Sequence, residues 1–138
     1  MNRLPPLGGE WIDRTRKVGF VFEGRRYEGF HGDTISSALL ANGLTILGRS
    51  FKYHRPRGVL SFANHDANAL VQWGERPNVR ADVTPIAEGM ELTAVNTFGG
   101  LASDRARFID WLAPVLPVGF YYKAFYSERW ERMFRRVE

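Results

Sequence analysis

The chain has 138 residues, of which 44% are hydrophobic and 25% charged, with a formal net charge of +4 and no cysteine. This length suits one domain with its own core, and the lack of cysteine excludes disulfide bonds and thiolate metal ligands. No run approaches 18 apolar residues, and residues 1–6 lack the apolar segment of a signal peptide, so we expect a cytoplasmic location.

The positive charge is concentrated in the first part of the chain. Residues 1–60 have a net charge of +5, residues 61–101 of −3, and residues 102–138 of +2. A nucleic-acid-binding protein would spread basic charge over one face, so this distribution argues against nucleic acid as a partner. It suits a surface that docks on another protein, or ordinary solvation.

The first half of the sequence predicts two strands and a helix. Residues 1–15 are rich in Pro and Gly and are expected to be extended. Apolar residues alternate over 18–22, which predicts a strand. A turn at 23–25 and a return strand over 27–30 complete a hairpin. Asp33 is expected to cap a helix that ends at Gly43 in the left-handed conformation.

Short strands are expected after the helix, over residues 44–47, 69–73, 79–84 and 90–94. Between the first two of these, Pro56 and Gly58 exclude a helix through the basic segment 49–57. Strand, strand, helix is the order in which a ferredoxin-like β-grasp domain begins.

The last third of the chain is rich in aromatic residues. Phe108, Trp111 and Leu112 fall on one face of a helix expected over about 103–113, and Ser127 is expected to cap a final helix. Aromatic residues together with Arg are typical of interface anchors, and this interpretation is favoured over the alternative that the segment wraps the core. The candidate interface residues are Phe120, Tyr121, Tyr122, Phe125, Trp130 and Phe134.

Four stretches of this sequence, in order and spacing, resemble the N-terminal segment of the alpha subunit of heterotetrameric sarcosine oxidase. They are residues 32–43 (GDTISSALLANG), 48–58 (GRSFKYHRPRG), 67–71 (ANALV) and 119–123 (GFYYK). The basic stretch is the most specific, because many ferredoxin-like domains share the helix segment. The resemblance covers residues 10–134, and it implies a β-grasp core.

The resemblance also identifies four positions where related domains hold an iron–sulfur cluster. Plant-type [2Fe–2S] domains bind it through cysteines spaced C-x4-C-x2-C, with a fourth further on. The matching positions here are Ser61, Asp66, Ala69 and Asp82. We therefore expect no cofactor in this chain, and in particular no iron–sulfur cluster. Flavin, and possibly NAD, would be carried by partner domains or subunits.

Asp66 and Asp82 are expected to accept hydrogen bonds from loop amides, in place of the cysteine thiolates that accept those bonds in cluster-binding domains. A repurposed hard-metal site, formed with Ser61 and His65, is the alternative. Such a site needs more carboxylates or carbonyls in fixed geometry, so no metal is predicted.

The basic segment is the best candidate for any remaining binding chemistry. If it is extended, Arg49, Phe51, Tyr53 and Arg55 would lie on one side. It could be scaffold for subunit docking, a nucleotide or flavin contact, or a nucleic-acid contact. The candidate residues are Arg49, Lys52, Tyr53, His54, Arg55 and Arg57.

The sequence thus predicts an α+β protein with a β-grasp, ferredoxin-like core and a helical, aromatic-rich C-terminal extension. An extended segment (1–15) precedes the core (16–96), and the extension covers 97–138. No catalytic residue is predicted. The expected function is a non-catalytic assembly domain or small subunit of a sarcosine-oxidase-like flavoenzyme that oxidises a secondary amine or amino acid. The alternative is a free-standing module whose basic segment binds an anion such as a nucleotide.

Overall fold

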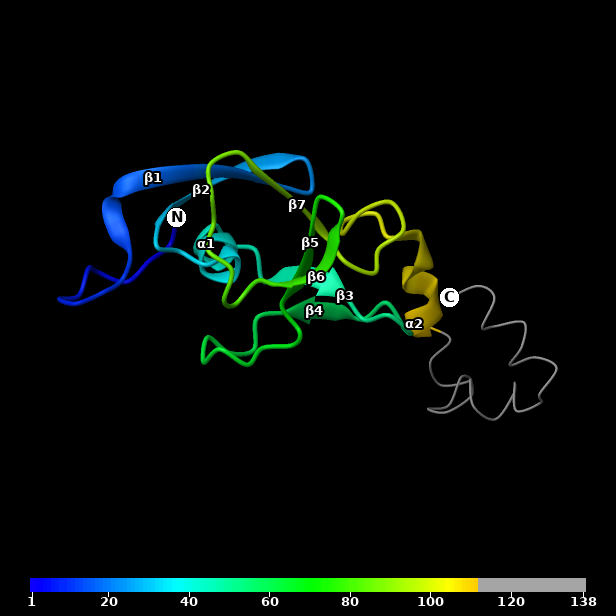
Figure 1. Cartoon of the computed structure of the whole chain (residues 1–138). Coiled ribbons are helices and arrows are strands. Elements are labelled where there is room, and N and C mark those ends of the chain that lie inside the picture. The colour runs from blue at the N-terminus through cyan, green and yellow to red at the C-terminus, as the bar shows by residue number, and fades with distance from the viewer. Residues whose placement is uncertain (112–138) are drawn as a thin grey trace.

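The computed structural model describes residues 1–111, which form a mixed β-sheet with one main helix (Figure 1). The first elements are β1 (Asp13–Phe22), β2 (Arg25–His31), α1 (Ile35–Ala41), β3 (Ile46–Arg49) and β4 (Pro56–Gly58). They are followed by β5 (Leu70–Trp73), β6 (Arg76–Arg80), β7 (Met90–Ala94), the 3-10 turn η1 (Arg105–Arg107) and α2 (Phe108–Trp111).

The main sheet has the strand order β2-β1-β7-β5-β6, and β3 and β4 form a separate two-stranded sheet. β1 pairs in parallel with β7 and antiparallel with β2, so the first and last strands of residues 1–111 lie side by side within the sheet. This mixed sheet with few helices fits the expected ferredoxin-like β-grasp core. Among residues 1–111, no helix is long and apolar enough to cross a membrane.

The core lies between α1 and the sheet. Ile35, Ala38 and Leu39 of α1 are fully buried, as their spacing along one helical face requires. They pack in one cluster with buried side chains of the strands and of the adjoining connections: Phe20, Phe22, Leu47, Ala69, Val71, Ala81, Ile86, Met90, Leu92 and Ala94.

The helix begins one residue later than expected. Thr34, not Asp33, is the N-cap, and it forms a capping box with Ser37. The Asp33 carboxylate instead accepts hydrogen bonds from Ser37 Oγ, from the Phe30 amide and from Arg3. Gly43 follows the helix with a φ of +84°, which confirms the predicted ending.

Two predicted strands differ from the structure. The strand predicted over 44–47 is β3, at 46–49, and it pairs with β4 at residues 56–58, where no strand was predicted. The strand predicted over 79–84 is β6 and ends at Arg80, because the chain then turns and Ala81 and Thr84 bond to Ala69 and α1. β7 occupies 90–94 as predicted.

The predicted C-terminal extension is described only as far as Trp111. There it consists of η1 and α2, rather than one helix over 103–113. Phe108 and Trp111 are largely exposed, so they do not pack on the core as the face of that helix. The candidate interface residues Phe120, Tyr121, Tyr122, Phe125, Trp130 and Phe134 lie outside the described residues.

Both edge strands of the main sheet are protected. On β2, the Phe30 amide donates to Asp33 (2.8 Å), and the Glu28 carbonyl accepts from the Asn42 side chain (2.7 Å). On β6, Pro77 has no amide hydrogen, and Asn78 has a φ of +57° that interrupts a regular edge. An added strand would find few free groups at either edge.

Replacing Gly58 with Ala is expected to destabilise the fold, because its Cβ would collide with the backbone carbonyl oxygen of Thr45 across the β3–β4 pair. Overpacking of this kind costs about 1–3 kcal/mol, measurable by urea unfolding. Gly8→Ala is the control, since nothing lies within 4 Å of its added Cβ. Equal stability of the two variants would contradict the tight approach at β3–β4.

Candidate functional site

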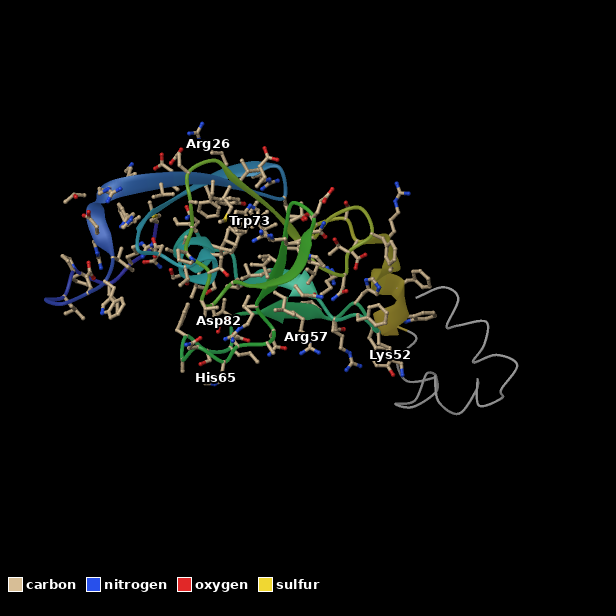
Figure 2. All side chains as sticks on the ribbon, viewed as in Figure 1. Arg26, Lys52, Arg57, His65, Trp73 and Asp82 are labelled. Atoms are coloured by element: carbon tan, nitrogen blue, oxygen red, sulfur yellow. The ribbon has the colours of Figure 1, made fainter. Side chains whose placement is uncertain are left out.

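The four positions that match cluster ligands lie in or beside one loop. Ser61, Asp66 and Ala69 belong to the connection between β4 and β5, and Asp82 follows β6. Figure 2 shows this loop projecting from the sheet, with His65 near its outer end and Asp82 between the loop and α1. Bonds through Asp66 bring the four positions together.

The Asp66 carboxylate is the centre of this loop, and the side chain is almost fully buried. One oxygen accepts the amides of Leu60 (2.6 Å) and Ser61 (3.1 Å), and the other accepts the amide of Asn68 (2.8 Å). Burial raises the pKa of Asp66, but these amides and that of Ala69 outweigh it, so the pKa lies below its usual value.

Asp82 connects this loop to β6. Its Oδ2 accepts the amide of Asp66 (3.0 Å), and the Arg80 guanidinium binds both carboxylate oxygens, at 2.6 and 3.1 Å. The Arg80 guanidinium is the main reason that the pKa of Asp82 lies below its usual value. The prediction that Asp66 and Asp82 bind loop amides is therefore confirmed.

The loop does not offer a hard-metal site. The Asp66 oxygens face backbone amides, and the Asp82 oxygens face Arg80. His65 is exposed, and its Nδ1 contacts the carbonyl of Ala63. In residues 1–111 no group of three or more His, Asp or Glu side chains is placed to hold a metal ion.

The basic segment forms a hairpin, not the extended strand considered above. The backbone closes from Ser50 to Arg55 (2.9 Å), and His54 has a φ of +52°. Its candidate side chains therefore point in three directions, and the predicted one-sided face does not form. Figure 2 labels Arg57, which contacts Asn68 of the β4–β5 loop, and Lys52 of the hairpin.

Arg49 and His54 turn inward to Asp104. His54 Nδ1 lies 2.9 Å from Asp104 Oδ2, and Arg49 Nε lies 3.2 Å from the same oxygen. Arg49 also donates to the carbonyl of His54 (2.7 Å). Burial raises the pKa of Asp104, but the amides of Phe98 and Ala106, with His54, hold it below its usual value. These side chains therefore stabilise the hairpin from within.

The remaining candidates lie at the tip and on β4. Lys52 and Arg55 both stack on the Tyr53 ring, at 5.1 and 4.9 Å from its centroid. Arg57 donates to the side chain of Asn68 and so ties β4 to the loop. An anion-binding role for this segment stays a prediction, but the six candidates do not share one surface.

Sequence reasoning missed the role of Asp104. Its position before a helical pattern signals an N-cap, and its Oδ1 does accept the amide of Ala106. No local sequence pattern around Asp104 or around His54 links the two residues, which are 50 positions apart in the chain. Glu23 was also missed: its carboxylate accepts the amides of Ala94 and Leu101, both at 2.7 Å.

Comparison with known proteins relates this fold to iron–sulfur domains. Residues 15–97 match the family described as the 2Fe-2S iron-sulfur cluster binding domain. The chain is also similar to a solved structure, L-proline dehydrogenase from P. horikoshii, with a TM-score of 0.51 and 25% identity. That similarity covers 62% of this chain and 17% of the other.

Curated relatives resemble between two thirds and almost all of this chain. The alpha subunit of sarcosine oxidase from Rhizobium meliloti (strain 1021) is 43% identical over 98% of this chain. The corresponding subunit from Corynebacterium sp. (strain U-96) is 32% identical over 67% of it. This chain spans only 14% and 10% of those relatives' own lengths.

The family match corrects one prediction. We expected no iron–sulfur cluster in this chain, whereas the matched family is described by its binding of one and points to an iron–sulfur cofactor. The residues of this chain do not fit that group, because thiolates hold such clusters and the sequence has no cysteine. At the matching positions, Asp66 and Asp82 bind amides and Arg80 instead.

Replacing Asp66 with Asn is expected to lower the free energy of unfolding at neutral pH by about 1–3 kcal/mol, because an amide NH2 would face backbone donors. The pKa of the Asp66 carboxyl is lower in the folded protein than in the unfolded chain. The ionised carboxylate therefore stabilises the fold at pH values above the unfolded pKa, and this stabilisation is lost as the pH falls through the folded pKa. Asp66→Asn should therefore unfold with a shallower pH dependence below about pH 5.

Urea unfolding at several pH values measures both effects. Glu91→Gln is the control, because Glu91 is an exposed carboxylate of β7. If Asp66→Asn matched the control in stability and in pH dependence, the carboxylate would not organise the loop.

Proposed function

The chain belongs to the 2Fe-2S iron-sulfur cluster binding domain family, and we propose that it is a non-catalytic assembly domain or small subunit of a flavoenzyme that oxidises a secondary amine or amino acid. The observation that carries this proposal is the 43% identity to a sarcosine oxidase alpha subunit over 98% of the chain. The partners are other domains or subunits of that enzyme.

The names of the relatives support the substrate class. Sarcosine and L-proline are both secondary amino acids, and the two kinds of relative act on them by oxidation or dehydrogenation, as their names state. A shared domain in two such enzymes favours a role common to both. Assembly is such a role, since it does not depend on the choice of amine.

The buried ionisable groups support a structural role for the chain itself. Asp33, Asp66, Asp82 and Asp104 are each buried and each accept hydrogen bonds from amides or side chains of the fold. A catalytic acid or base would need access to a substrate and a proton to transfer. In residues 1–111 these carboxylates are instead occupied within the domain.

A partner would contact side chains rather than extend the sheet, because β2 and β6 offer few free edge groups. The aromatic residues of 108–134 supply such side chains. The proposed assembly role thus includes the interface predicted for the aromatic residues of this C-terminal segment. A cytoplasmic location is part of the same proposal.

Replacing Trp130 or Tyr122 with Ala is expected to weaken assembly by about tenfold or more, as for central aromatic anchors of interfaces. The chain would be tagged, expressed in its native host and purified, and the flavin absorbance that co-elutes would be measured per chain. Trp11→Ala is the matched control, because Trp11 is an exposed tryptophan of the N-terminal segment. If flavin co-elution were unchanged in both Trp130→Ala and Tyr122→Ala, docking through the aromatic residues of 108–134 would be contradicted.

A further inference from the structure

The loop between β4 and β5 is held by hydrogen bonds rather than by apolar packing. Leu60 is 77% exposed and Phe62 is 56% exposed, and residues 62–65 are all exposed. The group inside the loop is charged, since the Asp66 side chain is almost fully buried. A buried charge is costly unless hydrogen bonds surround it, so the donors around Asp66 decide the conformation of the loop.

The donors that surround this carboxylate are backbone N–H groups. The amides of Leu60 (2.6 Å) and Ser61 (3.1 Å) reach Oδ2, and the amide of Asn68 (2.8 Å) reaches Oδ1. Burial raises the pKa of the Asp66 carboxyl, but these amides and the amide of Ala69 hold it below its usual value. An N–H group can only donate, so the centre of the loop is matched to an anion.

Each of the four positions that match cluster ligands takes part in this arrangement. Ser61 and Ala69 contribute amides, Asp66 contributes the carboxylate, and Asp82 accepts the amide of Asp66 (3.0 Å). The thiolates that hold a cluster in the matched family are also anions. This chain therefore places a charge of the same sign at the positions where that family places its ligands.

Two guanidinium groups lie beside the loop. Arg80 binds Asp82 (2.6 Å), and the pKa of Arg80 lies above its usual value, mainly because of Asp82 and in part because of the charge on Asp66. Arg57 donates to the side chain of Asn68, whose amide binds Asp66. Positive charge at this distance favours an anion at the centre of the loop.

We propose that residues 60–69 form a binding site for a small anion, built from the backbone amides of Leu60, Ser61 and Asn68, and that the Asp66 carboxylate is the ligand that the chain supplies for itself. The ligand class is a carboxylate or an anion of similar size. This inference goes beyond the proposed function and does not depend on it. It also reconciles the family match with the lack of thiolates, because backbone donors can surround either kind of anion.

The test removes the carboxylate and returns it as a free anion. Asp66→Gly leaves the backbone amides in place and opens the space of the side chain, so the urea midpoint of unfolding should fall at neutral pH. Sodium formate should then return most of the lost midpoint, rising with the logarithm of the formate concentration once the site is filled. This is the dependence expected for a ligand that binds only the folded chain.

Two controls separate binding at this site from a general effect of the salt. The unaltered chain measures the general effect, because its site is already occupied. Asp66→Asn is the matched variant, since its carboxamide fills the same space, and formate should stabilise it no more than the unaltered chain. Amide resonances in ¹H–¹⁵N spectra of Asp66→Gly locate the anion: those of residues 60, 61 and 68 should shift along one saturable curve.

Each outcome supports or overturns the proposal. Formate that raises the midpoint of Asp66→Gly no more than that of the unaltered chain overturns it, as do saturable shifts confined to other residues or equal stabilisation of Asp66→Asn. If Asp66→Gly is unfolded without formate, refolding by formate supports the proposal. If it stays unfolded in formate, Asp66→Ala, whose backbone is less flexible, is titrated in the same way and decides. Flavin co-elution plays no part in this test, so its failure would leave the assembly role standing.

Discussion

The carboxylate of Asp66 lies where the backbone of one loop turns back on itself, and it accepts amides from both ends of that turn. Its own amide donates to Asp82, which is held in turn by Arg80. Because a buried carboxylate must be fully hydrogen-bonded, each of these contacts constrains the others. The position of β6, the path from β4 to β5 and the exposure of Leu60 and Phe62 all depend on this network.

A second network fixes the other end of the molecule in the same manner. Asp104 receives the side chains of Arg49 and His54 and the amides of Phe98 and Ala106. It joins the β3–β4 hairpin to the segment that leads into α2. The basic segment thus divides into an inner part that supports the hairpin and an outer part at the tip. An extended segment, as considered from the sequence, would instead have placed Arg49 and Arg55 on one side and Lys52 and His54 on the other.

Local signals predicted the regular elements well. The alternation of Phe20 and Phe22, the spacing of the α1 core residues and the position of Gly43 each act within a few residues. Errors arose where distant groups decide the outcome. Asp33 was available to cap α1, but Arg3 and the Phe30 amide compete for it. β6 ends early because Ala81 bonds across to Ala69 and α1. The hydrogen-bonding roles of Asp66 and Asp82 were predictable only through the family resemblance.

The parallel pairing of β1 with β7 has a consequence for synthesis on the ribosome. Phe20 and Phe22 lie opposite Met90 and Leu92, some 70 residues later, so the centre of the sheet cannot close until the chain has been made beyond Ala94. Until then the apolar face of the β1–β2 hairpin is exposed, because β7 is not yet available to pack beside it. A nascent chain in this state is prone to aggregation. Glu23 then accepts the amides of Ala94 and Leu101. The turn of the first hairpin thereby secures β7, the last strand of residues 1–111.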